Sequence, residues 1–267
     1  MIRQPAVAGS FYPAHPEELS AQVDALLVSD KVPCQAKAII VPHAGYVYSG
    51  AVAGEVFAET MIPRQVILIG PNHQGTGPAI AVSAADAWVT PLGKVALAKD
   101  LRAALVNNFP QLSQDDQAHE YEHSLEVMLP FLLRRQPELE IVPIILGRLG
   151  YGDCVSFGTA LAKTLKDWKQ DVLLLASSDM NHFSSAEKTE KLDSLAIAAM
   201  IAYDQQQLYQ VVRDNNISMC GLLPAITIMQ AAQELGASSC QLVRYSHSGK
   251  VNGDFSSVVG YAGLTIQ

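Results

Sequence analysis

Short apolar runs alternate with helical patterns along this chain. The apolar runs contain few polar residues, have the length of buried strands, and cover residues 37–41, 65–69, 140–146 and 171–176. Between them, apolar residues recur at the spacing of a helix that buries one face, as Leu125, Met128, Leu129 and Leu132 do. Helices are predicted near residues 17–28, 50–61, 98–108, 157–168, 184–203 and 221–235.

Uniformly apolar strands are typical of a parallel sheet, because helices cover both of its faces. Two further strands, expected at 241–245 and 257–264, have no helix between them, so we expect one antiparallel edge. No Pro-, Gly- or Ser-rich linker and no internal repeat divides the chain. The pattern predicts an α/β fold, a single three-layer α/β/α domain over residues 1–267 with a mainly parallel, mixed sheet.

Composition and charge exclude several classes of protein. Of the 267 residues, 49% are hydrophobic and 16% are charged, which excludes a disordered chain. The net charge is −8 and basic residues do not cluster, so the chain lacks the footprint of a nucleic-acid binder. No apolar run approaches the ~20 residues that cross a bilayer, and residues 1–13 contain no apolar signal segment. With four cysteines far apart, we expect a cytoplasmic protein with reduced thiols and no membrane or nucleic-acid partner.

Three of the seven histidines follow predicted strands at their carboxyl ends. His43 comes two residues after the first apolar run, His73 four residues after the second, and His182, with Asp179, just after the fourth. Ligands of open α/β sheets bind at this edge, so the three histidines are expected to line one pocket. A single histidine in such a loop is more often structural, but three at equivalent positions favour a metal site. Imidazole binds iron, copper and zinc, so the histidines alone do not identify the metal.

A second pattern competes for the metal. Residues 119–123 read His-Glu-Tyr-Glu-His, which matches the H-E-x-x-H signature of zinc hydrolases. In those enzymes His119 and His123 would be zinc ligands one helical turn apart, with Glu120 as the general base. No third histidine follows at the spacing of related zinc enzymes, and the start of a helix explains the glutamates electrostatically. A zinc hydrolase is therefore our third hypothesis.

Seven stretches of the sequence resemble the Memo family, whose prokaryotic members are called AmmeMemoRadiSam system protein B. These stretches keep the family's order, and they are Ala8–Pro13, Pro42–Gly50, Gly70–His73, Thr90–Gly93, Glu122–Leu132, Ser177–Phe183 and Ser256–Gly263. The resemblance implies a fold like that of LigB-type class III extradiol dioxygenases. Those enzymes bind Fe(II) with two histidines and a carboxylate, and use further histidines to transfer protons.

The resemblance also implies roles for individual residues. His43 and His73 match the two metal-binding histidines, His182 matches an acid/base histidine, and His123 matches one that contacts substrate or O₂. The other residues expected at the site are Asp179 in catalysis and Asn72 and Tyr46 in substrate binding. The implied cofactor is a divalent metal that purification can remove, Fe(II) before copper or zinc.

The third metal ligand is where the chain departs from the family. The dioxygenases place a glutamate in the C-terminal segment and eukaryotic Memo proteins place a cysteine there, but residues 246–254 contain neither. Asp254 is the nearest carboxylate, and His182 or Asp179 are the alternatives. If none of them binds, we expect the metal to be held weakly.

Two classes of function are consistent with these residues. The first is a metal-dependent oxidoreductase with dioxygenase-like activity on an unknown small molecule. The second is a non-enzymatic binding or scaffold module that reuses the dioxygenase fold, which the incomplete ligand set favours. The family name adds a radical-SAM or AMMECR-type protein as an expected partner. The sequence leaves open whether the chain is an enzyme.

Overall fold

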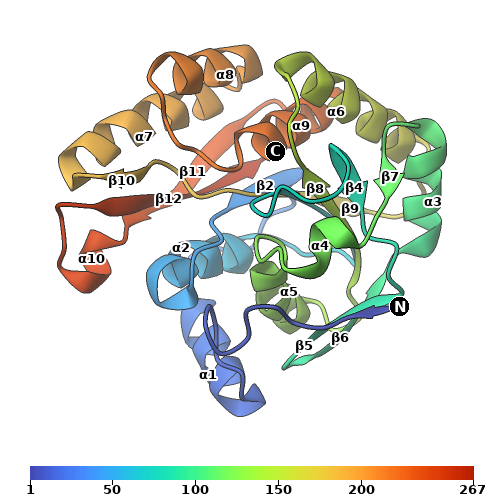
Figure 1. The fold of residues 1–267 in the computed structure, drawn as a ribbon, viewed down its shortest axis with the longest axis horizontal. Coiled ribbons are helices and arrows are strands. Elements are labelled where there is room, and N and C mark those ends of the chain that lie inside the picture. Colours follow the sequence, from blue (N-terminus) through green and yellow to red (C-terminus); the bar gives the residue numbers. More distant parts are fainter.

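A mixed sheet of twelve strands forms the centre of the protein, which a computed structural model describes over residues 1–267 (Figure 1). The strands are β1 (Ile2–Arg3), β2 (Ala38–Val41), β3 (Gln65–Pro71), β4 (Ile80–Val82), β5 (Ala87–Thr90), β6 (Gly93–Leu97), β7 (Ser113–Gln114), β8 (Glu140–Leu146), β9 (Val172–Ser177), β10 (His182–Ser184), β11 (Cys240–His247) and β12 (Val258–Ile266). The helices are α1 (Pro16–Leu26), α2 (Tyr46–Glu59), α3 (Lys99–Asn108), α4 (Gln117–Glu120), the 3₁₀ helix η1 (Glu126–Met128), α5 (Leu129–Arg135), α6 (Tyr151–Lys166), α7 (Ala186–Ile201), α8 (Gln205–Asp214), α9 (Leu222–Glu234) and α10 (Gly249–Asn252).

The centre of the sheet is parallel, as the apolar runs predict. In the strand order β1-β5-β6-β8-β3-β9-β2-β12-β10, the strands β8, β3, β9 and β2 are parallel neighbours. The predicted antiparallel edge is also present, because β12 runs antiparallel to β2, β10 and β11. A further antiparallel pair, β5 and β6, meets at Thr90 and Gly93 and extends the opposite side of the sheet, which the apolar pattern does not predict.

Each central strand is buried on both faces because its side chains alternate between two cores. In β2, Ala38 and Ile40 enter one core, whereas Ile39 and Val41 enter the other. Burying a side chain of this kind contributes roughly 1.5–3 kcal/mol, which explains why the runs tolerate so few polar residues. Figure 1 shows helices α6, α7, α8 and α9 on one side of the sheet and α1, α2 and α5 on the other. The predicted three-layer α/β/α architecture is confirmed.

Three helices begin at least two residues away from their predicted start. α2 begins at Tyr46 rather than at 50. α6 begins at Tyr151 rather than at 157, because the Asp153 carboxylate accepts a hydrogen bond from Gly150 N–H (2.8 Å) and stabilises an earlier start. α7 is capped by Ser185, whose Oγ accepts from Lys188 N–H. The predicted start at 184 is too early, because β10 still includes that residue. No helix of the protein is long and apolar enough to cross a membrane.

The segment between α4 and α5 is not one continuous helix. α4 ends at Glu120, and residues 121–125 are non-helical before η1 begins. Leu125, Met128 and Leu129 are nevertheless fully buried, as their spacing predicts. The break in the helix matters because it places His123 in a loop at the edge of the sheet.

Candidate metal centre

Three histidines meet at the carboxyl ends of the parallel strands. His43 follows β2, His73 follows β3, and His123 comes from the loop between α4 and η1. One ligand nitrogen from each ring lies within 4.8 Å of the other two, close enough for a single metal ion to contact all three. We call these three residues the histidine cluster.

The His43 ring is oriented by a chain of two hydrogen bonds. Ser177 Oγ–H donates to the carbonyl of Ser124 (2.6 Å), so Ser177 Oγ is left to accept from His43 Nδ1–H (2.5 Å). This arrangement selects the tautomer in which Nε2 carries a free lone pair, the form that binds a metal. Burial, together with the neighbouring histidines, lowers the pKa of His43 well below its usual value. The ring is therefore neutral at pH 7.

His73 is held at two points by Glu122. Its backbone N–H donates to Glu122 Oε2 (2.7 Å) and its Nδ1–H donates to Oε1 (2.8 Å). Burial alone would lower the pKa of His73, but the carboxylate outweighs burial and raises that pKa. Burial likewise opposes ionisation of Glu122, yet the contacts with His73 lower its pKa to about 2. Glu122 is thus an anion that orients His73 with Nε2 free, a pattern common among metal-binding histidines.

His123 completes the cluster from the loop side. Its ring stacks on His73, with centroids 4.8 Å apart and 22° between the planes, and contacts Phe11 at 4.7 Å. The side chain is 20% exposed, so this side of the cluster faces solvent. Burial lowers the pKa of His123. Because a protonated imidazole cannot bind a metal, the lowered pKa of His123, like that of His43 and unlike the raised pKa of His73, favours a ligand role at neutral pH.

A thiol, Cys220, borders the site although the sequence does not single it out. Its Sγ lies 3.3 Å from His43 Nε2 and accepts a hydrogen bond from Asp179 N–H (3.2 Å). Gly221 permits this approach, since a Cβ at that position would lie 2.3 Å from the carbonyl oxygen of Ser177. Burial raises the pKa of the thiol, so it becomes a thiolate only beside a cation such as a metal. The signal in the sequence is a Cys-Gly pair directly before an apolar helix.

Asp179 and His182 lie outside the histidine cluster and are each held by backbone contacts. Asp179 Oδ1 accepts a hydrogen bond from the backbone N–H of His43 (2.8 Å), and burial raises the pKa of Asp179 to about 7. His182 lies on β10, where its Nδ1–H donates to the carbonyl of Ser218 (2.9 Å) and leaves Nε2 free. Burial lowers the pKa of His182, so it is a neutral base at pH 7. Catalysis by either residue stays a prediction.

The structure places His123, rather than the expected His182 or Asp254, third in the cluster. Asp254 lies between α10 and β12, where the chain carries it into solvent and its carboxylate accepts hydrogen bonds from Ser256. The resemblance implies a third ligand in the C-terminal segment, whereas the nearest sulfur donor, Cys220, precedes α9.

The zinc-hydrolase interpretation is wrong, because His119 and His123 do not share a helix. α4 ends between them at Glu120. His119 is buried away from the cluster, with Nε2 facing the carbonyl of Ala81 (3.2 Å) and its ring packed edge-on against Trp88 at 5.6 Å. His119 is therefore a structural residue of the core.

The two residues expected to bind substrate both make structural contacts. Tyr46 is buried, and its hydroxyl donates to the carbonyl of Val127 (2.6 Å). Asn72 closes its own loop, because Oδ1 accepts from Gly75 N–H (2.7 Å) and Nδ2 donates to the carbonyl of Thr76 (2.6 Å). Substrate contact by either side chain stays a prediction.

The loop that carries Glu122 and His123 is fixed by the N-terminal segment. Arg3 donates to the carbonyls of His119 (2.6 Å) and Glu122 (2.7 Å) and forms a buried ion pair with Glu126 (2.8 Å). The Glu126 carboxylate also accepts from the Tyr12 hydroxyl (2.6 Å). Removing one partner of a buried ion pair typically costs about 3–5 kcal/mol, so the cluster depends on contacts far apart in the sequence.

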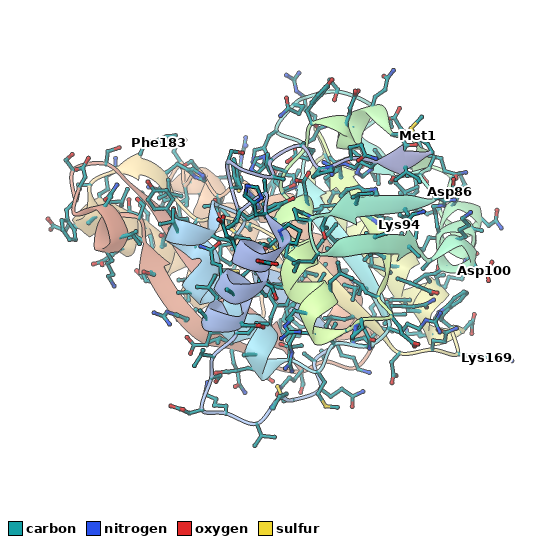
Figure 2. The ribbon with its side chains drawn as sticks, turned by 90° about the horizontal axis from the view of Figure 1, so that it is seen from below. Met1, Asp86, Lys94, Asp100, Lys169 and Phe183 are labelled. Carbon is teal, nitrogen blue, oxygen red and sulfur yellow. The ribbon has the colours of Figure 1, made fainter.

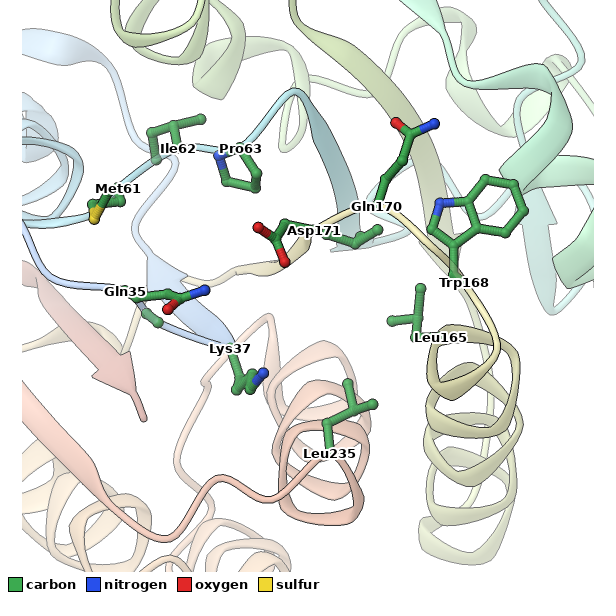
Figure 3. A pocket seen from close by; sticks show the side chains of 12 residues that line it. Gln35, Lys37, Met61, Ile62, Pro63, Leu165, Trp168, Gln170, Asp171 and Leu235 are labelled. Atoms are coloured by element: carbon green, nitrogen blue, oxygen red, sulfur yellow. The ribbon is translucent and has the colours of Figure 1, made fainter.

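A separate hollow of about 350 Å³ lies at the opposite ends of the same strands (Figure 3). It is lined by residues at or before the starts of β2, β3 and β9, among them Lys37, Trp168 and Asp171. It contains no histidine. The hollow is thus distinct from the candidate metal centre.

Known proteins resemble this chain along its whole length. Residues 3–265 match the family model described as Memo-like protein. A MEMO1 family protein from Aquifex aeolicus is 44% identical over 265 residues and covers 98% of both chains. Another from Methanopyrus kandleri is 36% identical over 281 residues, covering 100% of this chain and 99% of its own. The crystal structure of an uncharacterized protein from Escherichia coli K12 shares the fold, with a TM-score of 0.55 and 12% identity over 85% of this chain and 98% of that one.

Proposed function

This chain belongs to the Memo family, and we propose that its histidine cluster binds a redox-active divalent metal for oxidative chemistry on a small molecule. The observation that carries the proposal is the convergence of three imidazole nitrogens within 4.8 Å at the strand ends. In two of the rings, His43 and His73, Nδ1 is committed to an oxygen acceptor, so Nε2 is left for the metal.

The donor set fits a transition metal. Three imidazoles and a nearby thiol suit iron, copper or zinc, whereas Mg²⁺ and Ca²⁺ prefer oxygen ligands. The only carboxylate bonded to a cluster side chain, Glu122, is already engaged by His73, so the set differs from two histidines and a carboxylate. We propose Fe(II) first, because three histidines leave positions open for substrate and oxidant. A bound metal of this kind would supply electron transfer and polarise its other ligands.

His182 is the residue that we propose to move protons. Its Nδ1–H is held by the Ser218 carbonyl, so Nε2 is the nitrogen that accepts and returns a proton. A lowered pKa keeps this nitrogen unprotonated at pH 7. Under this proposal, His182→Gln abolishes turnover but leaves the metal bound, because His182 is not part of the cluster.

Metal analysis tests the proposal directly. The full chain is purified without chelator, and iron, copper and zinc are quantified by inductively coupled plasma mass spectrometry. We expect near-stoichiometric metal in the wild type and loss of most of it in His43→Ala, His73→Ala and His123→Ala. His15→Ala, which removes an exposed histidine outside the cluster, is the matched control. Circular dichroism confirms that each variant is folded.

The result that contradicts the metal site is equal metal content in the wild type and in the folded cluster variants. Anomalous diffraction collected across the iron, copper and zinc edges then identifies the metal at the cluster. Zinc alone at that position would contradict the redox chemistry while leaving the metal site intact.

A second candidate function, a binding module, is favoured by Phe183. This side chain is 79% exposed, next to His182, and has a left-handed backbone (φ 59°), which is uncommon for a bulky residue. Figure 2 shows Phe183 at one end of the molecule, opposite Met1 and Lys169. We propose that it contacts a protein partner of the radical-SAM or AMMECR type. Co-purification that persists in Phe183→Ser would contradict this role.

We also propose that the protein works in the cytoplasm. All four cysteines are free thiols, and Cys220 needs to stay reduced to remain available beside His43. Fractionation of the cells that make the protein, followed by immunoblotting, tests the location. Recovery in a membrane or secreted fraction would contradict it.

A further inference from the structure

A hollow of about 670 Å³ opens beside the histidine cluster. It is lined by residues 72–75 and 77–79, which include His73, and by Gly147 and Arg148 after β8. His73 therefore belongs both to the cluster and to this hollow, which we call the loop pocket. A molecule bound here would lie next to the metal site.

The loop that lines the pocket offers backbone N–H groups. Gly75 and Gly77 have positive φ (69° and 77°), a conformation that turns the backbone sharply and suits glycine. The hydrogen bonds of Asn72 hold this turn in place. The N–H groups of Gln74 and Gly77, two residues of the lining, donate to no acceptor within the protein. Loops of this kind, with turned backbone and unpaired amides, commonly bind anions.

Arg148 is the only permanently charged side chain that lines the pocket. It is exposed, forms no ion pair and donates no side-chain hydrogen bond, although the chain has 26 acidic residues against 18 basic ones. Asp115 lies near Gly77, but its carboxylate accepts from Ala118 N–H (2.8 Å) and does not line the pocket. The pocket thus pairs a free guanidinium with free amides and contains no carboxylate.

We propose that the loop pocket binds the carboxylate or phosphate group of the substrate and so presents the rest of that molecule to the metal at His73. The guanidinium of Arg148 matches either anion through paired N–H donors. The proposal assigns a substrate class to the function proposed above and rests on it. The substrates selected in this way are acidic small molecules, and neutral analogues without the anionic group are excluded.

Anion binding is measured without the metal. A pocket that fails to bind anions can then be distinguished from a cluster that fails to bind a metal. The chelator-treated full chain is titrated with inorganic phosphate and, in a second arm, with acetate, while ¹H–¹⁵N spectra are recorded. We expect the amide signals of Gln74 and Gly77 to shift saturably. Arg148→Gln should weaken binding by about tenfold or more, the usual effect of losing a charge-assisted hydrogen bond.

Lys169→Gln is the matched control, because it removes one exposed positive charge from the segment between α6 and β9. It should bind the anion like the wild type. Arg148→Lys keeps the charge but loses the paired donors, so its affinity should fall between those of the wild type and Arg148→Gln. Arg148→Gln should take up as much zinc as the wild type, which separates the pocket from the cluster.

Saturable binding of phosphate supports a substrate with a phosphate group, and saturable binding of acetate supports one with a carboxylate; either result supports the proposal. It is overturned if neither anion gives saturable shifts in the loop. It is also overturned if Arg148→Gln binds as tightly as the wild type, or if Lys169→Gln weakens binding equally, since binding would then follow net charge alone.

Discussion

Glu122 binds His73 through both carboxylate oxygens, one on the backbone N–H and the other on the ring Nδ1–H. The backbone contact fixes where the residue lies, and the ring contact fixes which nitrogen faces the cluster. Position and tautomer therefore depend on one side chain. A change at Glu122 tests whether this arrangement prepares a metal ligand.

Glu122→Gln keeps the size of the side chain but removes its charge. The two donors of His73 now bind separate carboxylate oxygens, and Oε1 also accepts from Ser124 N–H (3.0 Å). The amide offers only one oxygen, so one donor of His73 loses its partner. We expect metal affinity to fall about 10- to 100-fold, as for other residues that orient a ligating histidine. A competition titration against a chelator measures the affinity. Glu120→Gln, at an exposed position two residues away, should leave it unchanged, and equal affinities in the two variants would contradict the role.

Cys220→Ser tests whether the thiol joins the metal site. Its sulfur lies 3.3 Å from His43 Nε2, the nitrogen proposed to bind the metal. We expect the Co(II)-loaded wild type to show a sulfur-to-metal charge-transfer band in the near ultraviolet, and Cys220→Ser to lack it. Cys34→Ser, a change at a half-buried thiol elsewhere, should retain the band. The absence of a band in the wild type would show that the thiol stays unbound.

Two glycine-to-alanine changes should have opposite effects on stability. At Gly221 a Cβ would lie 2.3 Å from the Ser177 carbonyl and from Ser178 Cβ, so Gly221→Ala must displace backbone and should cost about 1–3 kcal/mol or more. At Gly152, in α6, no heavy atom lies within 4 Å, so Gly152→Ala should gain up to about 1 kcal/mol from helix propensity. Urea denaturation measures both. Equal stability of the two variants would contradict the close approach at Gly221.

Asp193 should make stability fall as pH rises. It is fully buried and accepts from Asn181 N–H (2.8 Å) and the Tyr245 hydroxyl (2.7 Å), but burial outweighs these bonds and raises its pKa to about 6. Between about pH 4, the ordinary pKa of an aspartate, and about pH 6, Asp193 is therefore protonated in the folded state but ionised in the unfolded chain. The stabilisation is complete below about pH 4 and is lost as pH rises through about 6.

Asp193→Asn removes this titration while keeping a side chain of the same shape. The wild type should lose this stabilisation between pH 5 and pH 8, whereas the variant should not. The free energy of unfolding of the variant minus that of the wild type should therefore rise by roughly 1–1.5 kcal/mol from pH 5 to pH 8. Urea denaturation at both pH values measures the difference, with the exposed Asp100→Asn as a charge-matched control. A difference between variant and wild type that is the same at both pH values would refute the assignment.

The sequence predicts the sheet, and the histidines at the carboxyl ends of its strands, because buried parallel strands have a recognisable apolar pattern. Ile39 and Leu174 belong to strands buried on both faces, and complete burial selects the apolar runs that are visible in the sequence. His43 and His73 were predictable neighbours because each directly follows such a strand, and parallel strands end at the same edge.

The rest of the site depends on contacts that leave no local pattern. His123 reaches the cluster from an interrupted helix, so the periodicity around it misrepresents its direction. Cys220 meets His43 across 177 residues, and its neighbours resemble an ordinary helix start. Arg3 supports Glu126 across 123 residues through a pairing that composition cannot reveal. Such contacts follow from the tertiary fold rather than from spacing along the chain.

The position of β2 between β9 and β12 determines the order in which the site is built during synthesis. The strand that carries His43 leaves the ribosome early, but both of its neighbours are encoded more than a hundred residues later. Until β9 and β12 emerge, the sheet is incomplete and its strand ends cannot bring the histidines together. A metal that the cluster binds would therefore be loaded late, largely after translation, and the early apolar strands must be protected from aggregation until the last residues have been made.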